Sequence, residues 1–591
     1  MGTNYWTKTV SRRRAMRGAA LVGAGLLAPS ILSCGSDGGG EPQTGLISEP
    51  GDTTGQAKRG GIHQSFAAQD EANIDPFTTS RGGGRGGAES PGYQKLLREK
   101  AVAGGTTTQT FIGDAAESYE LADGGLRLVA KLRPNNKFDP RPPTNGRAMN
   151  AQDVVYSWNR LEAQSTYASV LSYKRSEGAA PIESVTAVDD RTVVYRMAFP
   201  WSALLPGIAE GGPHQIGPVE AEEFNPRNTI RGSGPWMLDY EPSVSYKWRR
   251  NPGYFDSQFP FLDGYDEPIV SEYAARLAQF RAKQIWDFAP SPSDLPQFIQ
   301  DLSGMQVYQG LLSSAVAHIW FSGHATNPFR DVRMRRAVSM ALDRELYAEV
   351  ISESEKLRAI GLPVTNIIDN NVAGGDAEYY LDPFGKEMGE AAQYFKHNVP
   401  EAKKLVAAAG YPNGVDLLWK GSSNHNTRVT EILTQMIAEA GLRTKQEIVN
   451  YTSVYLPNVL SARGDWEGDI TMWGSVAPFT IATNLQRIWH PTGGTTRVSC
   501  FTKACDDDHA KIAALIEKAL REVDASAYKS QIHELQRLMG LHQGAISYNY
   551  SSTPFSLIWP WVKNWQVWRL SRAQTRYHYV WADEELRRQM A

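Results

Sequence analysis

The sequence is poor in cysteine and has no strong excess of charge of either sign. Its 591 residues contain three Cys, with 61 Lys and Arg against 64 Asp and Glu, a formal net charge of -3. A nucleic-acid-binding domain would show a basic excess, and a disordered chain would be richer in charge and poorer in apolar residues. The composition, 41% hydrophobic and 21% charged, therefore excludes both classes and predicts roughly two to four folding units.

The motifs of common enzymes are also missing. No G-x-x-x-x-G-K-[ST], G-x-S-x-G or H-E-x-x-H pattern occurs. Residues 82–87 match G-x-G-x-x-G, but no strand precedes them and no helix follows, so we interpret them as a surface loop. Carboxylate pairs are too common in a chain of this size to indicate or exclude a glycosidase. We predict no enzymatic activity, no cofactor, no metal and no nucleic-acid partner.

The chain lacks a run of 18 apolar residues, so it contains no candidate membrane-spanning helix. Its first residues instead hold a basic region, the short apolar stretch 19–28, and Ile31-Leu32-Ser33-Cys34. This order is typical of an export signal. The paired arginines after Ser11 resemble a twin-arginine signal, and residues 31–34 resemble the bacterial lipoprotein cleavage box, in which the Cys carries the lipid. We therefore predict a signal peptide over 1–34, lipidation of Cys34, and a location at the outer surface of the cell membrane or in the periplasm.

Residues 35–61 contain nine glycines and almost no apolar side chains. Such a segment cannot offset its ordering entropy by burying apolar surface. We predict a flexible tether that would hold a water-soluble protein close to the membrane.

The two remaining cysteines, Cys500 and Cys505, lie five residues apart. Oxidation is the default in an exported chain, which favours a disulfide between them. Two free thiols, or a zinc site with His490 and His509, are the alternatives, although the spacing of these four residues is loose for structural zinc.

Aromatic residues are abundant, with 16 Trp and 25 Tyr, and we expect part of them to line a cleft for an organic ligand. The chain otherwise alternates strand-like and helical patterns, which predicts α/β or α+β layers. The predicted strands are 126–132 and 192–197, and the predicted helices are 151–161, 333–350, 401–409, 430–440 and 507–523.

Five segments, in order, resemble the extracellular solute-binding proteins of family 5, the peptide and nickel-type receptors of ABC importers. They are Asn73-Ile74-Asp75-Pro76; residues 132–138 (LRPNNKF) with 150–157 (NAQDVVYS); residues 232–236 (GSGPW) with 250–255 (RNPGYF); residues 331–344 (DVRMRRAVSMALDR); and residues 401–405 (EAKKL) with 409–414 (AGYPNG).

The resemblance implies a two-lobed α/β fold like that of periplasmic binding proteins (type II, large, with an extra subdomain) and a ligand cleft between the lobes. Lobe I would comprise residues 62–317 and 546–591, and lobe II residues 318–545. The segments 318–321 and 545–550 would be the strands that cross between the lobes.

In peptide-binding members, a "GW..D" stretch supplies an Asp that pairs with the peptide ammonium. The matching stretch here is 472–479, and Val476 occupies the acidic position. A buried ammonium without a carboxylate would be penalised, so the resemblance favours a ligand that is less charged at that end, such as a sugar, an opine-like conjugate or another small organic molecule. The candidate ligand-binding residues are Ser80, Arg81, Trp320, Phe321, Trp473, Gly474, Ser475, Val476, Asn484, Arg497 and Tyr548.

The resulting expectation is a monomeric substrate-binding lipoprotein. It would capture a peptide-like or other small organic solute and deliver it to the permease subunits of an ABC importer. An exported hydrolase, or a sensor or chaperone that has lost transport, is the alternative on the same fold.

Overall fold

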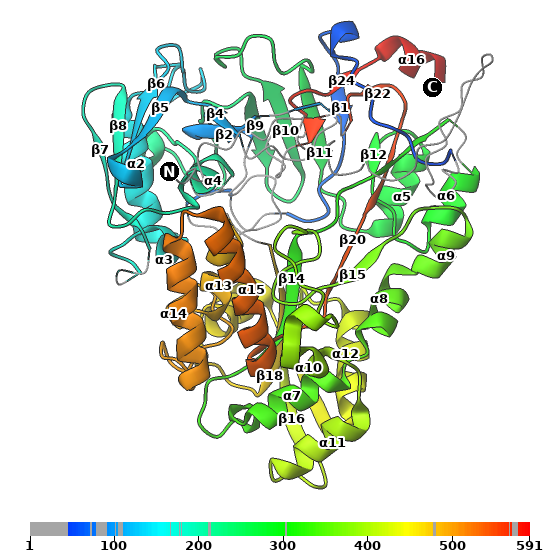
Figure 1. Ribbon diagram of the computed structural model, residues 1–591. Coiled ribbons are helices and arrows are strands. Elements are labelled where there is room, and N and C mark those ends of the chain that lie inside the picture. The colour runs from blue at the N-terminus through cyan, green and yellow to red at the C-terminus, as the bar shows by residue number, and fades with distance from the viewer. Residues whose placement is uncertain are drawn as a thin grey trace, which may run out of the picture.

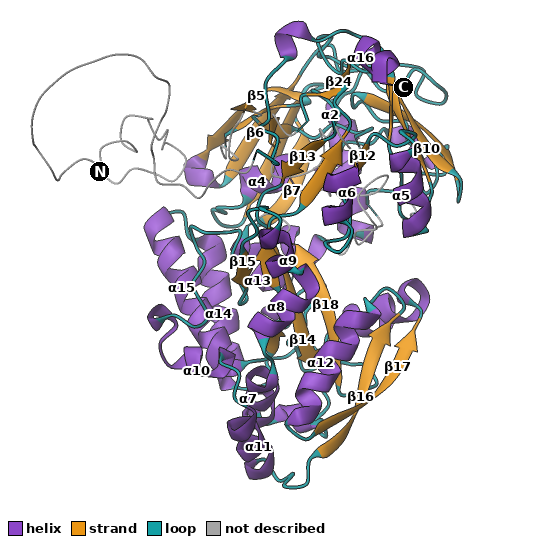
Figure 2. Cartoon of the chain, turned by 90° about the vertical axis from the view of Figure 1, so that its right-hand side faces the viewer, coloured by secondary structure: helices purple, strands orange, loops and turns teal. Residues whose placement is uncertain are grey.

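The computed structural model has two lobes, one above the other in Figures 1 and 2, and both combine sheets with helices. The upper lobe holds three sheets, and the lower lobe is built around one five-stranded sheet. The structure describes residues 45–70, 74–77, 91–100, 102–103, 110–165, 167–176, 178, 180–210, 214–301, 304–476, 480–565, 568–569 and 577–590.

Two four-stranded sheets form most of the upper lobe. One has the order β1-β11-β10-β9, with β1 (Ile62–Gln64) parallel to β11 (Gly264–Pro268), and β10 (Ser245–Arg250) antiparallel to both β11 and β9 (Trp236–Glu241). The other is antiparallel, and α2 packs on it. Its order is β5 (Ala116–Ala122), β6 (Arg127–Leu132), β8 (Thr192–Met197) and β7 (Ile182–Ala187).

The third upper sheet joins distant parts of the chain, because β21 (Phe555–Ile558) lies between β12 (Asp287–Phe288) and β13 (Gln306–Gln309). Short strand pairs and helices complete the lobe. The pairs are β2 (Leu97–Glu99) with β4 (Phe111–Gly113), β3 (Val102–Ala103) with β23 (Trp568–Arg569), and β22 (Val562–Lys563) with β24 (Trp581–Ala582); the helices are α2 (Ala151–Gln164), α3 (Ala168–Leu171), α4 (Leu204–Glu210), α5 (Tyr273–Arg281), α6 (Leu295–Asp301) and α16 (Glu584–Met590).

The lower sheet has the order β17-β16-β18-β14-β19. Its apolar face packs against α7, α11 and α12, and Figure 2 shows α12 beside β16 and β17. The strands are β14 (Ala315–Phe321), β16 (Val415–Ser422), β17 (Leu442–Val449), β18 (Ile470–Val476) and β19 (Ala545–Ser547); the helices are α7 (Val332–Ala341), α8 (Arg344–Ser352), α9 (Ser354–Ala359), α10 (Ala392–Phe395), α11 (Val399–Ala408), α12 (Thr427–Glu439), α13 (Ile481–Trp489), α14 (Asp507–Arg521) and α15 (Ala525–His542).

The helix and strand predictions hold well, with one exception. The predicted strand 192–197 is β8, and the predicted helix that begins at Ala151 is α2, whose start carries a capping box between Asn150 and Asp153. The predicted helix 333–350 is wrong as a single helix. It is broken between α7 and α8, because the Asp343 side chain accepts a hydrogen bond from Leu346 N and caps a new helix.

The two segments predicted to cross between lobes are strands of the lower sheet. β14 pairs antiparallel with β19 over His318 to Trp320, and both belong to that sheet. The chain passes between the lobes just beyond them, between β13 and β14 and between β20 (Tyr550–Ser552) and β21. Strand β20 pairs with β15 (Asn366–Ile368), a second pair near this passage. The expected boundaries therefore lie a few residues inside the lower lobe.

The Gly-rich segment predicted as a tether contacts the upper lobe over its second half. Ser48 N donates to Val307 O at 2.7 Å, and the Thr53 hydroxyl donates to Asn564 Oδ1 at 2.7 Å. Leu46 and Ile47 pack on the aromatic core of the upper lobe. The tether prediction therefore fails for residues 45–61, since two apolar side chains and these hydrogen bonds anchor them. Residues 35–44, Cys34 and the predicted signal peptide lie outside the described residues.

The abundance of Trp is explained mainly by packing and not by a cleft. A core of the upper lobe contains six buried indoles, and Trp559 stacks on Trp561 with ring centroids 5.2 Å apart. Such rings bury large apolar areas between the sheets. The six are Trp236, Trp248, Trp286, Trp559, Trp561 and Trp565.

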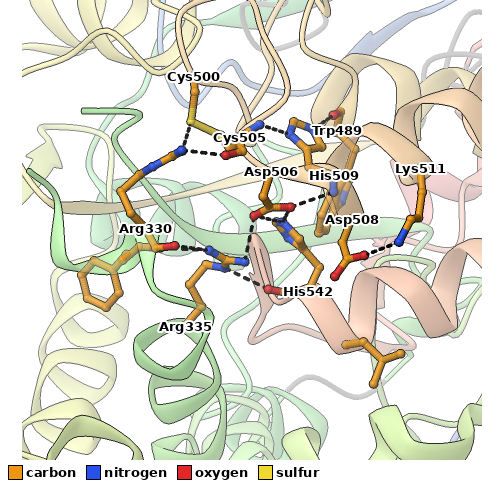
Figure 3. A network of polar contacts seen from close by, with 12 residues as sticks. Arg330, Arg335, Trp489, Cys500, Cys505, Asp506, Asp508, His509, Lys511 and His542 are labelled. Carbon is orange, nitrogen blue, oxygen red and sulfur yellow. Dashed lines mark hydrogen bonds and ion pairs between the residues drawn. A yellow bond between two sulfur atoms is a disulfide. The ribbon is translucent and has the colours of Figure 1, made fainter. Parts of the chain in front are cut away.

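Cys500 and Cys505 form a disulfide, which closes a small loop before α14 (Figure 3). Arg330 donates to Cys505 O at 2.6 Å and also contacts Cys500 Sγ. His509, one of the two His of the zinc alternative, lies within 2.6 Å of Trp489 O through Nε2 and accepts from Cys505 N through Nδ1. The disulfide thus closes the loop, and ordinary hydrogen bonds fix it to α13 and α14.

Asp506 follows this loop and ties three helices together (Figure 3). Its side chain accepts a hydrogen bond from His509 N at 2.9 Å and so caps α14. The same carboxylate lies 3.1 Å from His542 Nε2, at the end of α15, and 3.5 Å from the Arg335 guanidinium of α7. Burial alone would raise the pKa of this carboxyl, but these donors hold the pKa well below its ordinary value. Burial lowers the pKa of His542, which donates here as a neutral imidazole.

Replacing Asp506 with Asn should lower the free energy of unfolding by about 1–3 kcal/mol. Asparagine preserves the cap of α14 but removes the charge that compensates the buried Arg335, which is 5% exposed. Urea unfolding measures the change. The matched control is Asp508→Asn, because Asp508 and Lys511 form an exposed pair at 2.8 Å, and exposed pairs contribute little to stability.

The difference in the free energy of unfolding between the wild type and Asp506→Asn should depend on pH. Because the pKa of Asp506 is depressed in the folded state, its stabilisation is present above the ordinary carboxyl value of about 4 and is lost as the pH falls below it. The stability difference between the wild type and Asp506→Asn should therefore shrink between pH 5 and pH 3. A difference that stays constant over that range would contradict the role of the charge.

Candidate functional site

The face of the lower sheet opposite α7, α11 and α12 carries a cluster of aromatic side chains. Strands β14 and β18 pair so that His318 lies opposite Trp473 and Trp320 lies opposite Thr471. Since side chains alternate along a strand, His318, Trp320 and Trp473 share this face, and Ile319, Phe321 and Met472 point to the helix-covered core. We call this surface the β14–β18 face.

A π-helical segment, η8 (Tyr451–Leu460), covers part of the β14–β18 face. Tyr455 is buried, and its hydroxyl donates to Met472 O at 2.8 Å. The Tyr451 ring stacks on Trp473 with centroids 4.9 Å apart and planes at 10°. Both of these rings are partly exposed, so they present a flat apolar surface at the edge of the cluster.

Two arginines lie near this cluster, Arg497 against Trp320 and Arg487 close enough to Tyr451 to act on its pKa. Arg497 is 3% exposed, donates from Nη1 to His318 Nδ1, and lies over the Trp320 ring at 5.2 Å. Arg487 on α13 lies over the Tyr167 ring at 5.4 Å, next to α3 of the upper lobe. Helix α13 packs against α3, so this end of the β14–β18 face is where the two lobes meet.

The charges of the two arginines act on their neighbours. Burial lowers the pKa of Arg497 to about 9, and the positive charge of Arg487 adds to this effect. Burial together with the charge of Arg497 lowers the pKa of His318 well below its ordinary value. His318 is therefore neutral, which leaves Nδ1 free to accept from Arg497. Burial raises the pKa of Tyr451, and Arg487 opposes that shift.

The structure brings some of the predicted ligand-binding residues together. Trp320, Trp473 and Arg497 lie on or beside the β14–β18 face. Asn484 is buried in the first half of α13, the helix that also carries Arg487. Gly474 is exposed and follows Trp473 on β18.

Two predicted residues lie elsewhere. Phe321 stacks on Phe329 with ring centroids 4.0 Å apart, in the core beneath α7, so its assignment to the ligand site is wrong. Tyr548 packs against Tyr347 in the same core. Burial raises the pKa of Tyr548, and the nearby charge of Arg497 opposes that shift. Ser475 and Val476 are the last residues of β18, and the structure describes their backbone but not their side chains. Ser80 and Arg81 are not among the described residues.

Sequence reasoning missed several members of the cluster. Tyr451, Tyr455 and Arg487 belong to no motif; the fold brings the two tyrosines to Trp473 and brings Arg487 near Tyr451. His425 also lies there, 5.5 Å from the Trp473 ring, and burial lowers its pKa to about 4. The aromatic spacing of Tyr451 and Tyr455 on one helical face was the signal that could have identified η8.

The described part of the chain offers no group of three His, Cys, Asp or Glu side chains placed to hold a metal ion. Within the same residues, no helix combines the length and apolar character needed to cross a bilayer. The β14–β18 face thus offers stacking, hydrogen bonding and positive charge, which suit the binding of a solute.

Comparison of the sequence with models of protein families identifies a matching family. The family of bacterial extracellular solute-binding proteins, family 5, matches residues 110–496. The glutathione-binding protein GsiB of Pectobacterium atrosepticum is 24% identical over 341 residues, and GsiB of Escherichia coli K12 is 23% identical over 336 residues. These alignments cover 57% and 56% of this chain and 60% and 59% of the relatives.

Solved structures share the fold over most of the chain. The periplasmic binding protein DppA of Helicobacter pylori, in complex with the peptide STSA, has a TM-score of 0.71 at 18% identity and covers 90% of this chain and 100% of its own. AgaA of A. tumefaciens, in complex with agropinic acid, has a TM-score of 0.69 at 18% identity, with 88% and 99% covered. The two-lobed α/β fold predicted from the sequence is confirmed, and the chain belongs to the bacterial extracellular solute-binding proteins of family 5.

Proposed function

We propose that this protein is the substrate-binding component of an ABC importer. It captures a peptide-like or other small organic solute between its lobes and delivers it to the permease without changing it chemically. The observation that carries the proposal is the β14–β18 face, where the partly exposed rings of Tyr451 and Trp473 stack on each other and Arg497 lies over the neighbouring Trp320 ring.

The β14–β18 face offers surfaces suited to reversible binding. Stacked rings bind a solute by apolar area, and polar groups at their edge select its orientation. Closure of two lobes on the solute would shift the population from an open to a closed form, which a permease can recognise. Family membership supports this reading, since the relatives are named as solute-binding proteins.

The solute is best identified by native mass spectrometry of protein produced without residues 1–34, which retains any molecule that co-purifies. The purified protein should return that solute unchanged after incubation. Its steady conversion to a product would contradict the proposal and support the alternative of an exported hydrolase.

Trp473→Ala should weaken binding of the identified solute by about 10-fold to 30-fold, as expected for truncation of an aromatic anchor worth roughly 1.5–2 kcal/mol. Trp473→Phe should retain most of the affinity, because it keeps a stacking surface beside Tyr451. Isothermal titration calorimetry measures both. Phe501→Ala is the control, since Phe501 is 43% exposed on the disulfide loop near His324, at the far end of β14. Equal losses in Trp473→Ala and Phe501→Ala would contradict a site at Trp473.

We also propose that the protein is a lipoprotein held outside the cytoplasm by Cys34. The basis is the order of basic, apolar and small residues over positions 12–34. Cys34→Ser should move the protein from the membrane fraction to the soluble fraction after export, because a lipid anchor needs the thiol. Cell fractionation followed by immunoblotting measures the change, and membrane retention of the Cys34→Ser variant equal to that of the wild type would refute the anchor.

A further inference from the structure

Three arginines of the lower lobe are almost completely buried, and they differ in what compensates their charge. Arg335, Arg344 and Arg497 are 5%, 2% and 3% exposed. Burying a guanidinium is costly unless acceptors or an opposite charge surround it. The partners of each arginine therefore show whether its charge is satisfied within the protein.

Arg335 and Arg344 are satisfied by the protein itself. Arg335 donates to His542 O at 2.9 Å and to Phe329 O at 3.1 Å, and it lies 3.5 Å from the Asp506 carboxylate. Arg344 has four acceptors within 2.9 Å. They are Ser547 O, Ser339 O, Ser339 Oγ and Phe395 O.

Arg497 has no such set of partners. Within the described residues its side chain makes one hydrogen bond, to His318 Nδ1, and its Nε is buried without a partner. No carboxylate of these residues lies within ion-pair distance, and the charged group that acts on it most is another arginine, Arg487. The protein therefore holds a positive charge here that it does not neutralise.

The position of Arg497 links this charge to the proposed ligand site. Its acceptor, His318, is the register partner of Trp473, and the ring below it, Trp320, belongs to the same cluster. The backbone keeps the arginine in place, because Arg497 N donates to Ile488 O at 2.7 Å at the end of α13. A solute stacked on Trp473 would thus lie beside the imidazole that accepts from Arg497, and the charge of Arg487 reaches the same cluster at Tyr451.

We propose, on the basis of the proposed function, that the solute is an organic acid whose carboxylate binds to Arg497, with Arg487 as the second positive charge. Carboxylates accept two parallel hydrogen bonds from a guanidinium, and the buried Nε of Arg497 is a donor that lacks a partner among the described residues, which a carboxylate at Arg497 would supply.

Stability without any solute gives the first test. Arg497→Met should leave the melting temperature of solute-free protein unchanged or higher, because methionine fills similar space without an unpaired charge. Arg335→Met is the matched control and should lower it clearly, because it breaks the contact with Asp506. A loss in Arg497→Met as large as that in Arg335→Met would overturn the proposal by showing that Arg497 is a structural residue.

Anion binding gives the second test. Sulfate needs only positive charge and donors, so sodium sulfate should raise the melting temperature of the wild type more than that of Arg497→Met, relative to sodium chloride of equal ionic strength. The comparison between the two proteins removes the general effect of sulfate on stability. Equal gains would overturn the proposal. Arg497→Gln serves as a second variant if Arg497→Met does not fold.

Matched solutes give the third test. Reduced glutathione, agropinic acid, mannopinic acid and the dipeptide Met-Leu are compared with their carboxamide forms in thermal-shift and calorimetric titrations. An acid that binds to the wild type should bind about 30-fold or more weakly to Arg497→Met, and its carboxamide should bind weakly to both proteins. An acid and its amide that bind equally to the wild type would overturn the proposal.

The outcomes separate this inference from the proposed function. Tight binding of an uncharged solute, returned unchanged and unaffected by Arg497→Met, would refute the organic acid and leave the importer component intact. Chemical conversion of a bound acid, with its affinity lost in Arg497→Met, would keep the carboxylate site and refute the importer component.

Discussion

The hydrogen bonding of β14 to β18 on one side and β19 on the other is the constraint on which the candidate site depends. This register sets His318 opposite Trp473 and Ser547, and it brings the entry and exit of the lower lobe together in one sheet. A shift of one residue would move Trp473 from the aromatic cluster to the core beneath α7, because strand side chains alternate. The pairing thus fixes both the stacking surface and the place where the chain passes between the lobes.

The polar groups around this sheet divide into two classes. Arg335, Asp506 and His542 are neutralised within the protein and hold α7, α14 and α15 together, which supports the disulfide loop and, through it, the segment that carries Arg497. Arg497 is buried to a similar degree but lacks an acidic partner in the described part of the chain. Charges of the first class stabilise the fold, whereas a charge of the second class suits a solute that supplies the missing partner.

Local signals predicted the fold, and long-range contacts limited prediction of the site. The cap of α2 by Asn150 and Asp153 and the strand β8 each depend on a few neighbouring residues, so the sequence alone was sufficient to predict them. Strand alternation could also have separated Trp320 from Phe321, since adjacent residues of a strand cannot share a face. No local pattern could place Tyr451 beside Trp473 or Arg487 over Tyr167, because η8 and the lobe contact bring them there.

The contacts of residues 45–61 with the upper lobe also set a geometric limit. With Ser48 bonded to Val307 and Thr53 bonded to Asn564, the chain is fixed to the protein from this point onward. If Cys34 carries a lipid, the ten residues 35–44 connect the lipid to the upper lobe, and they can span at most about 35 Å. The attachment point on the upper lobe would then stay within that distance of the bilayer surface, so that, under the proposed function, the solute would be captured in a thin layer above the membrane.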